Sequence, residues 1–454
     1  MKKTILLISA LLTILPVFAS DNEAKKGESQ VKEHLQNHFK LYGFIRNYFV
    51  ADTRESVSGT GNLFYYLPKD VNMNDAGQDL NAQPSFRFLA LTSRVGLDVN
   101  GYYINNVHFG AKVEADFYSG LSGSTGTAAM RLRQAYATIT WKDLPLSDEK
   151  KASVGLKIGQ AWHPMAADFP HVFSLEVGAP FGPFSRTPQV TMDADLGGNW
   201  VITASALWQM QYTSMGPSWN STKKAYESAA SADYMKYSCI PEMYAGVTYK
   251  NKGFLFRAGV DMLSIAPRIQ NMKEVNDKYV AYKVNERLTT VSPFAYVQYA
   301  KGLFSVRAKT IYGQGGEHFN LMSGYVKVDA KEDGSWEYAP LRNSSSWLSL
   351  AYGKKWQGVL FLGYMKNLGL AEGVSDVPVV KSDIYFSKNG FPNLTQMYRI
   401  QPEIIYTIGK LNLGLEYQWT AVQYGKNFNN RALVTDELHW VGNHRVQMMV
   451  KYNF

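Results

Sequence analysis

The chain ends in the segment HRVQMMVKYNF, residues 444–454, in which apolar and polar side chains alternate almost without a break. Successive side chains of an extended strand point to opposite faces. The segment therefore predicts a strand with one polar face and one apolar face, the latter formed by Val446, Met448, Val450, Tyr452 and Phe454. Membrane lipid or the core of a soluble β-sandwich could cover that apolar face, and the rest of the sequence decides between them.

The amino-terminal residues favour the membrane. Residues 1–19, MKKTILLISALLTILPVFA, begin with a basic segment, continue as an apolar run and end on small residues. This pattern is typical of a cleaved secretory signal peptide, and the apolar run is too short for a membrane-spanning helix. No cysteine lies near the expected cleavage site, which excludes a lipid-anchored lipoprotein. Residues 20–37 are charged and polar and predict a short periplasmic lead-in, so the folded domain is expected over 38–454.

The composition suits a protein in which apolar and polar surfaces offset each other, so that the mean hydropathy of the chain is close to neutral. The chain contains 29 Tyr, 23 Phe and 37 Gly, its mean hydropathy is -0.23, and no run of 18 apolar residues follows the signal. Membrane helices are therefore not expected, whereas outer-membrane barrels combine lipid-facing and water-facing residues in this way. The net charge of +9 forms no basic cluster, so nucleic acid is not an expected partner. The single cysteine, Cys239, cannot form an internal disulfide.

Alternating stretches of about ten residues recur along the chain, and each is long enough to cross a bilayer when tilted. On this basis the sequence predicts sixteen strands, at residues 38–51, 86–99, 107–118, 131–142, 152–163, 188–197, 200–213, 241–251, 254–266, 287–301, 304–314, 346–355, 358–368, 395–409, 411–424 and 444–454.

The links between these strands alternate in length. Every second link is short, whereas the others are long and cover residues 52–85, 119–130, 164–187, 214–240, 267–286, 315–345, 369–394 and 425–443. Short turns on one side and long loops on the other are typical of membrane barrels and have no reason to occur in a soluble sandwich. The sequence thus predicts an all-β fold: a transmembrane antiparallel β-barrel of about sixteen strands with short periplasmic turns and long extracellular loops. Phe454 would close the barrel against the first strand and join an interfacial aromatic girdle.

The phase of the apolar face also assigns the lumen side of each strand. Cations outnumber carboxylates there by about two to one, and fixed positive charge in an aqueous passage concentrates anions. The cations expected to set this field are Arg94, Lys112, Arg131, Arg133, Arg307, Lys309, Arg399 and Arg445. The alternative is that cations brace the wall by pairing with lumen carboxylates, which we expect for about half of them.

The third long loop, residues 163–189, is the candidate constriction. A barrel of sixteen strands is too wide for side chains to fill, and this loop is apolar and rich in Pro and Gly, which suits a segment folded into the lumen. Its polar residues would then line a narrowing: His163, Asp168, His171, Glu176 and Arg186. The histidines and Asp168 lack a spacing typical of zinc sites, so neither a metal nor another cofactor is expected.

Four stretches resemble the DcaP-like family of trimeric outer-membrane porins, within the Gram-negative porin superfamily. They are LYGFIRNYF (41–49), LTSRVGLDV (91–99), RLRQAYATITW (131–141) and GLKIGQAW (155–162). The similarity covers roughly the first 200 residues and is generic beyond them. The resemblance implies a homotrimer of sixteen-stranded barrels, passive uptake, and a preference for small anionic solutes such as dicarboxylates.

The sequence therefore predicts a porin in the outer membrane of a Gram-negative bacterium, which lets small hydrophilic solutes diffuse passively with a mild anion preference. Its partners would be outer-membrane lipid, small solutes and the barrel insertion machinery, which would read the carboxy-terminal strand. No catalytic motif is recognisable, so an enzyme is not expected. The alternatives are a substrate-specific channel for small anions, an adhesion or structural barrel, and a barrel enzyme such as a phospholipase or protease.

Overall fold

The computed structural model of the protein describes residues 38–58, 65–90, 92–117, 121–122, 127–148, 150–374 and 377–454. The predicted signal peptide, residues 1–19, and the predicted lead-in, residues 20–37, lie outside these ranges. Within them, no helix combines the length and the apolarity that a membrane crossing requires.

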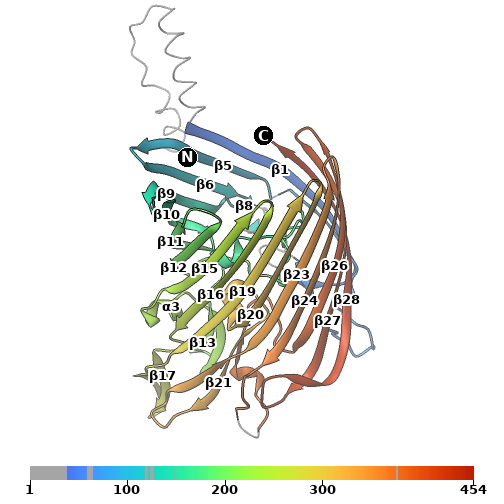
Figure 1. Ribbon diagram of the computed structural model, residues 1–454. Coiled ribbons are helices and arrows are strands. Elements are labelled where there is room, and N and C mark those ends of the chain that lie inside the picture. Colours follow the sequence, from blue (N-terminus) through green and yellow to red (C-terminus); the bar gives the residue numbers. More distant parts are fainter. Residues whose placement is uncertain are drawn as a thin grey trace, which may run out of the picture.

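Sixteen antiparallel strands of the described chain form a closed barrel (Figure 1). The first strand, β1 (Phe39–Asp52), pairs with the last strand, β28 (Val434–Asn453), and on its other side with β4 (Ser85–Leu89) and β5 (Arg94–Ile104), which are two segments of one strand. Neighbours in the chain are neighbours in the wall for the remaining strands, which are β6 (Val107–Asp116), β9 (Arg131–Pro145), β10 (Lys151–Trp162), β11 (Arg186–Asp195), β12 (Trp200–Leu207), β15 (Glu242–Asn251), β16 (Phe254–Ile265), β19 (Leu288–Lys301), β20 (Phe304–Gln314), β23 (Arg342–Gly353), β24 (Trp356–Gly369), β26 (Leu394–Ile408) and β27 (Leu411–Phe428).

The long loops carry short elements of their own. Pairs of strands form hairpins at β2 (Ser56–Ser58) with β3 (Tyr65–Pro68), β7 (Leu121–Ser122) with β8 (Thr127–Ala128), β13 (Met215–Asn220) with β14 (Ala225–Ala230), β17 (Gln270–Val275) with β18 (Lys278–Lys283), and β21 (Gly324–Ala330) with β22 (Trp336–Pro340). The strand β25 (Ile384–Phe386) extends the last hairpin. The helical segments are η2 (Pro164–Ala166), α3 (Asp233–Ser238), η3 (Gly316–Phe319) and η4 (Lys381–Asp383).

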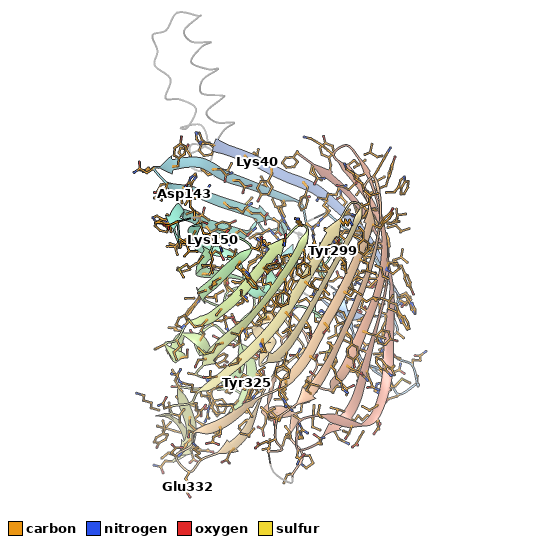
Figure 2. The ribbon with its side chains drawn as sticks, in the orientation of Figure 1. Lys40, Asp143, Lys150, Tyr299, Tyr325 and Glu332 are labelled. Carbon is orange, nitrogen blue, oxygen red and sulfur yellow. The ribbon has the colours of Figure 1, made fainter. Side chains whose placement is uncertain are left out.

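Both ends of the barrel domain lie at the rim that carries the short turns (Figure 1). Gly43 and Phe454 exchange two backbone hydrogen bonds there, of 3.3 and 3.1 Å. The long loops lie at the opposite rim, where Figure 1 places α3, β13, β17 and β21. Figure 2 likewise marks Lys40 and Asp143 at the first rim and Glu332 at the second. The predicted sorting of turns and loops is therefore confirmed.

The outer face of the wall is apolar, as the carboxy-terminal strand predicted. Val446 and Met448 are 48% and 52% exposed. Their neighbours in the strand, Arg445 and Gln447, point inward and are buried. Aromatic side chains gather outside the short-turn rim, where the ring of Trp200 lies 4.8 Å from that of Tyr249, and Trp356 stacks on Tyr406. An exposed apolar band with an aromatic girdle is the surface typical of a membrane barrel.

Three strands differ most clearly from their predicted bounds. The seventh strand, β12, ends at Leu207 rather than 213, because the chain then turns inward. The second strand is interrupted between β4 and β5. The last strand begins at Val434 rather than 444, since it continues past the membrane as a hairpin with β27, where no lipid imposes an apolar face.

Candidate functional site

Residues 163–185 of the predicted loop lie inside the barrel, against strands remote from their origin at β10. Residues 186–189 belong instead to the wall strand β11, so Arg186 is a wall residue. The Tyr48 hydroxyl of β1 donates a hydrogen bond to the Phe173 carbonyl, and the Phe173 N–H donates to Glu403 of β26 at 3.3 Å. The ring of Phe181 is fully buried in the same core. The position of the loop explains its apolar residues, because protein surrounds the loop on both sides.

Two predicted lumen cations of β20 are engaged by the backbone of this loop. Lys309 is buried, and its Nζ donates to the Met165 carbonyl at 2.5 Å. Arg307 donates to the Phe169 carbonyl at 3.0 Å. Both cations therefore donate hydrogen bonds to backbone carbonyl groups of the loop.

Two further cations contact the loop from the wall strands β26 and β28. Glu176 approaches Arg399 at 3.5 Å and Arg445 at 3.8 Å, and Arg445 Nε also donates to Asp52 at 2.9 Å. Arg399 and Arg445 are only 1% and 3% exposed. The loop therefore contacts four of the cations that were expected to set the field, Arg307, Lys309, Arg399 and Arg445, and all of them except Arg307 are buried.

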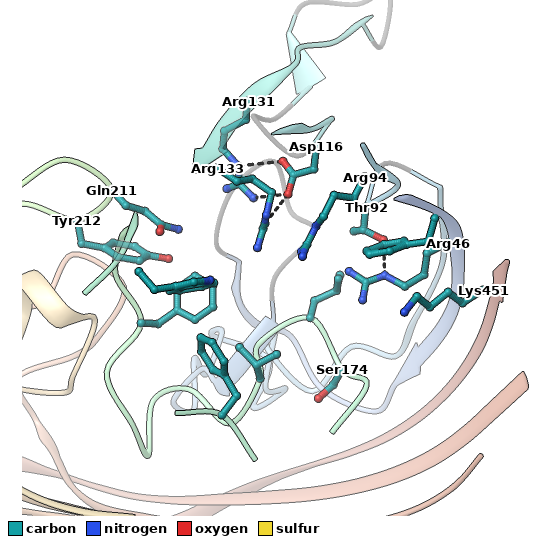
Figure 3. A pocket seen from close by; sticks show the side chains of 16 residues that line it. Arg46, Thr92, Arg94, Asp116, Arg131, Arg133, Ser174, Gln211, Tyr212 and Lys451 are labelled. Atoms are coloured by element: carbon teal, nitrogen blue, oxygen red, sulfur yellow. Dashed lines mark hydrogen bonds and ion pairs between the residues drawn. The ribbon is translucent and has the colours of Figure 1, made fainter. Parts of the chain in front are cut away.

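A cavity of about 400 Å³ lies between the loop and the wall formed by β1, β5, β6, β9 and β28. One side of it is basic, and Figure 3 shows Arg46, Arg94 and Lys451 projecting into the same space. The other side carries apolar and aromatic groups of the end of β10, of the loop and of the segment after β12, namely Trp162, Phe169, Leu175, Val177, Phe184 and Tyr212.

Part of the basic side is paired with carboxylates, as the bracing alternative predicted. Arg131 donates to both oxygens of Asp116, at 3.1 and 2.9 Å. Arg133 lies 2.6 Å from Asp116 and 2.8 Å from Glu114, which also approaches Arg94 at 3.5 Å. These three arginines and two carboxylates form a network that fixes the guanidinium groups in place. Figure 3 shows the part of it in which Asp116 bridges Arg131 and Arg133.

Positive charge nevertheless remains in excess. Arg46 donates to Thr92 Oγ1 at 3.1 Å, and neither it nor Lys451 forms an ion pair with a described residue. Arg186 donates to Gln211 and lies over the Trp162 ring, 4.8 Å from its centroid. Five cations and one carboxylate line the cavity, which leaves four net positive charges: Arg46, Arg94, Arg131, Arg133 and Lys451 against Asp116.

Lys112 lies apart from this cavity, toward the short-turn rim. Its Nζ lies 2.5 Å from Asp98 and donates to the Tyr42 hydroxyl at 2.9 Å. A lysine neutralised in this way adds little to the field of the cavity, so Lys112 braces the wall.

The polar residues predicted to line the constriction have separate partners. Asp168 forms a 2.6 Å ion pair with Arg257 of β16. His171 contacts Ser305 Oγ at 2.9 Å, and burial together with the Arg307 guanidinium lowers the pKa of its imidazole to about 4. His171 is therefore uncharged at neutral pH and contributes hydrogen bonds rather than positive charge.

His163 belongs to a fully buried cluster that the sequence analysis did not anticipate. Its Nε2 lies 3.1 Å from Glu242 of β15 and 3.4 Å from Asp261 of β16. His318 of η3 approaches the same two carboxylates at 3.2 and 3.9 Å. Four elements distant in sequence meet here, and no local spacing could have predicted the cluster.

The sequence analysis also missed part of the cavity wall. Arg46 of β1 and Lys451 of β28 line the cavity but were not among the cations expected to set its field. Gln211 and Tyr212 were placed in a strand that in fact ends at Leu207. An early turn inward leaves no periodic signal, so the alternation of the sequence could not reveal it.

Comparisons with known proteins give a match in structure but not in sequence. No protein-family profile matches the chain, and no curated protein matches it in sequence. The outer membrane channel DcaP of Acinetobacter baumannii is similar, with 18% identity, a TM-score of 0.56, and coverage of 92% of this chain and 97% of that one.

Two further solved structures match at lower similarity. An anion-selective porin from Comamonas acidovorans has 9% identity and a TM-score of 0.49, and covers 92% of this chain and 99% of its own. OmpT of Vibrio cholerae has 10% identity and a TM-score of 0.47, with 92% and 97% covered. The closed wall and the match to DcaP agree on the architecture. The chain therefore has the sixteen-stranded fold of the outer-membrane porins, as its resemblance to the DcaP-like family predicted.

Proposed function

We propose that the protein is a porin that lets small hydrophilic solutes diffuse passively across the outer membrane, with a mild preference for anions. The observation that carries this proposal is the excess of four positive charges around the cavity between the loop and the arginine-bearing wall. In a passage with low-dielectric walls, such an excess raises the local concentration of anions and lowers that of cations.

The loop of residues 163–185 sets the size limit in this proposal. It occupies the lumen and leaves a cavity of about 400 Å³, and ion pairs and hydrogen bonds to the wall hold it there. A rigid loop defines a fixed aperture, whereas a mobile one would give a variable cutoff. Passage therefore depends on geometry and fixed charge and needs no catalytic group.

A substrate-specific channel for small anions, such as dicarboxylates, is the second candidate function. The convergence of Arg46, Arg94 and Lys451 on one small cavity favours it, because three cations from different strands could bind two carboxylate groups at once. A specific channel would show block of its ion current by its own solute, whereas a general porin would not.

Assembly as a homotrimer is also part of the proposal. It rests on the resemblance to trimeric porins, together with the exposed apolar band, whose Phe49 and Phe88 rings stack 4.5 Å apart on adjacent strands. Such a surface can be covered by lipid or by a second barrel. Chemical cross-linking of the folded protein should give a band of three chains, and a monomer alone would contradict this part.

Liposome swelling tests the proposed passage. Vesicles that contain the folded protein should swell quickly in monosaccharides and progressively more slowly in di- and trisaccharides. Vesicles that remain sealed to every solute, although the protein is folded, would refute the porin proposal and favour an adhesion or structural barrel.

A further inference from the structure

The strongest unexplained feature of the barrel interior is the buried cluster of Glu242, Asp261, His163 and His318. All four side chains are between 0% and 2% exposed. Ligand atoms of His163, Glu242 and Asp261 lie within 4.8 Å of one another. Several atoms lack a hydrogen bond of acceptable geometry, namely both oxygens of Glu242, Asp261 Oδ1 and the Nε2 atoms of the two histidines. Buried polar atoms are normally satisfied, and the two histidines leave Glu242 Oε2 without a partner among the described residues, so the cluster calls for one more partner.

The protonation of the two rings can be assigned from their Nδ1 contacts. The Met165 N–H donates to His163 Nδ1 at 3.1 Å, which places the proton of a neutral His163 ring on Nε2. In His318 the arrangement is reversed, since Nδ1 lies 3.2 Å from the Gly315 carbonyl, which can only accept. The Nε2 lone pair of a neutral His318 is therefore free and points at the carboxylates, the orientation that metal-binding histidines adopt.

The charge of the cluster also points to a cation. Glu242 and Asp261 bring two negative charges into a site that excludes water, and a buried carboxylate without a compensating charge is strongly destabilising. His163 supplies a donor but no charge in the tautomer that Met165 imposes. If His318 were protonated, its single positive charge would leave one of the two carboxylate charges uncompensated. A divalent cation bound by a neutral His318 would balance the charges of both carboxylates.

The distances suit first-row metal coordination. Ligand atoms held about 2.0–2.2 Å from a zinc ion lie roughly 3.4 Å apart in a tetrahedral site. His318 Nε2 lies 3.2 Å from Glu242 Oε1 and 3.9 Å from Asp261 Oδ2. One imidazole and two carboxylates suit zinc or a similar transition metal, whereas calcium and magnesium prefer a shell of oxygens alone.

We propose that Glu242, Asp261 and His318 bind a zinc ion inside the barrel, and that His163 donates a hydrogen bond to the ligating carboxylates. The site would join the wall strands β15 and β16 to two segments that lie in the lumen, the start of the 163–185 loop and η3. Zinc would thus fix one end of the loop, and this inference does not depend on the proposed transport function.

Metal analysis of the folded full-length barrel tests the site. The protein is stripped with EDTA, dialysed against zinc, calcium or magnesium, washed, and measured by elemental mass spectrometry. We expect one zinc per chain and neither of the other ions. Glu242→Gln and His318→Gln should lower the zinc content at least tenfold, and His163→Gln should weaken zinc binding by roughly tenfold without abolishing it.

His439→Gln is the matched control, because it removes a histidine that pairs with a carboxylate, Asp70, outside the cluster. It should retain one zinc per chain. If the cluster variants do not fold, cobalt added to the unaltered barrel decides instead, since a four-coordinate site containing nitrogen gives strong visible absorption bands. A barrel that takes up no zinc and gives no such bands, or cluster variants that bind as much zinc as His439→Gln, would overturn the proposal.

Discussion

Arg399 and Glu176, which are 223 positions apart in the chain, form an ion pair of 3.5 Å beneath the lumen loop. Glu176 also lies 3.8 Å from Arg445, so one loop carboxylate faces two buried guanidinium groups. This relationship holds the loop to the wall strands β26 and β28. It also explains why lumen cations serve two purposes in this barrel: some fix the loop and others face the cavity.

Removal of the Glu176 charge should therefore destabilise the barrel. Glu176→Gln keeps the size of the side chain but leaves Arg399 without its carboxylate partner, and breaking a buried ion pair costs about 3 kcal/mol or more. Urea unfolding of the protein in liposomes measures the free energy. Glu227→Gln, in an exposed pair with Lys223, serves as control and should change nothing measurable. Equal stability of both variants would contradict the anchoring role.

Loss of the two unpaired cations should weaken the anion preference. The double variant Arg46→Gln and Lys451→Gln halves the charge excess of the cavity, so the ratio of chloride to potassium permeability should fall roughly twofold or more. Reversal potentials in a salt gradient give the ratio. The double variant Lys223→Gln and Lys236→Gln removes the same charge from exposed loops and should leave the ratio unchanged.

Closure of the barrel should be sensitive to the contact between Gly43 and Phe454. A Cβ atom on Gly43 would lie 2.5 Å from the Phe454 ring and from the Arg94 carbonyl, so Gly43→Ala should lower the yield of folded barrel. A Cβ atom on Gly358 meets nothing within 4 Å, and Gly358→Ala should fold normally. Boiled and unboiled samples on a gel give the folded fraction. Similar yields for both variants would show that this closing contact is dispensable.

Acid should destabilise the protein through His171. Its pKa of about 4 in the folded barrel lies below the ordinary value of about 6.5, so the unfolded chain binds the proton more tightly. Wild-type stability relative to His171→Asn should be constant above about pH 6.5 and fall as the pH drops toward 4. Unfolding curves at several pH values measure this difference. A stability difference that is independent of pH would show that His171 titrates normally.

The sequence was informative wherever lipid imposes an apolar face. All sixteen strands of the wall were predicted, because alternation is required where one face meets lipid and the other water. Beyond the membrane this requirement ends, which is why the start of β28 at Val434 was placed too late. The inward turn after Leu207 was missed for the same reason.

The candidate site was predicted only in part. Arg94, Arg131 and Arg133 follow from the strand phase, and they do line the cavity. The partners of Arg399 and Lys309 depend on how the loop of residues 163–185 packs, and no periodicity encodes that packing. The meeting of His163 with Glu242, Asp261 and His318 joins four segments, so it was accessible only from the folded chain.

The central claim is that the closed barrel conducts small ions through a passage with excess positive charge. The most direct test is the zero-current potential of single channels in a planar bilayer with a potassium chloride gradient. The account predicts discrete conductance steps and a potential whose sign shows faster passage of chloride. A membrane that contains folded protein but stays silent, or a potential that shows faster passage of potassium, would contradict it.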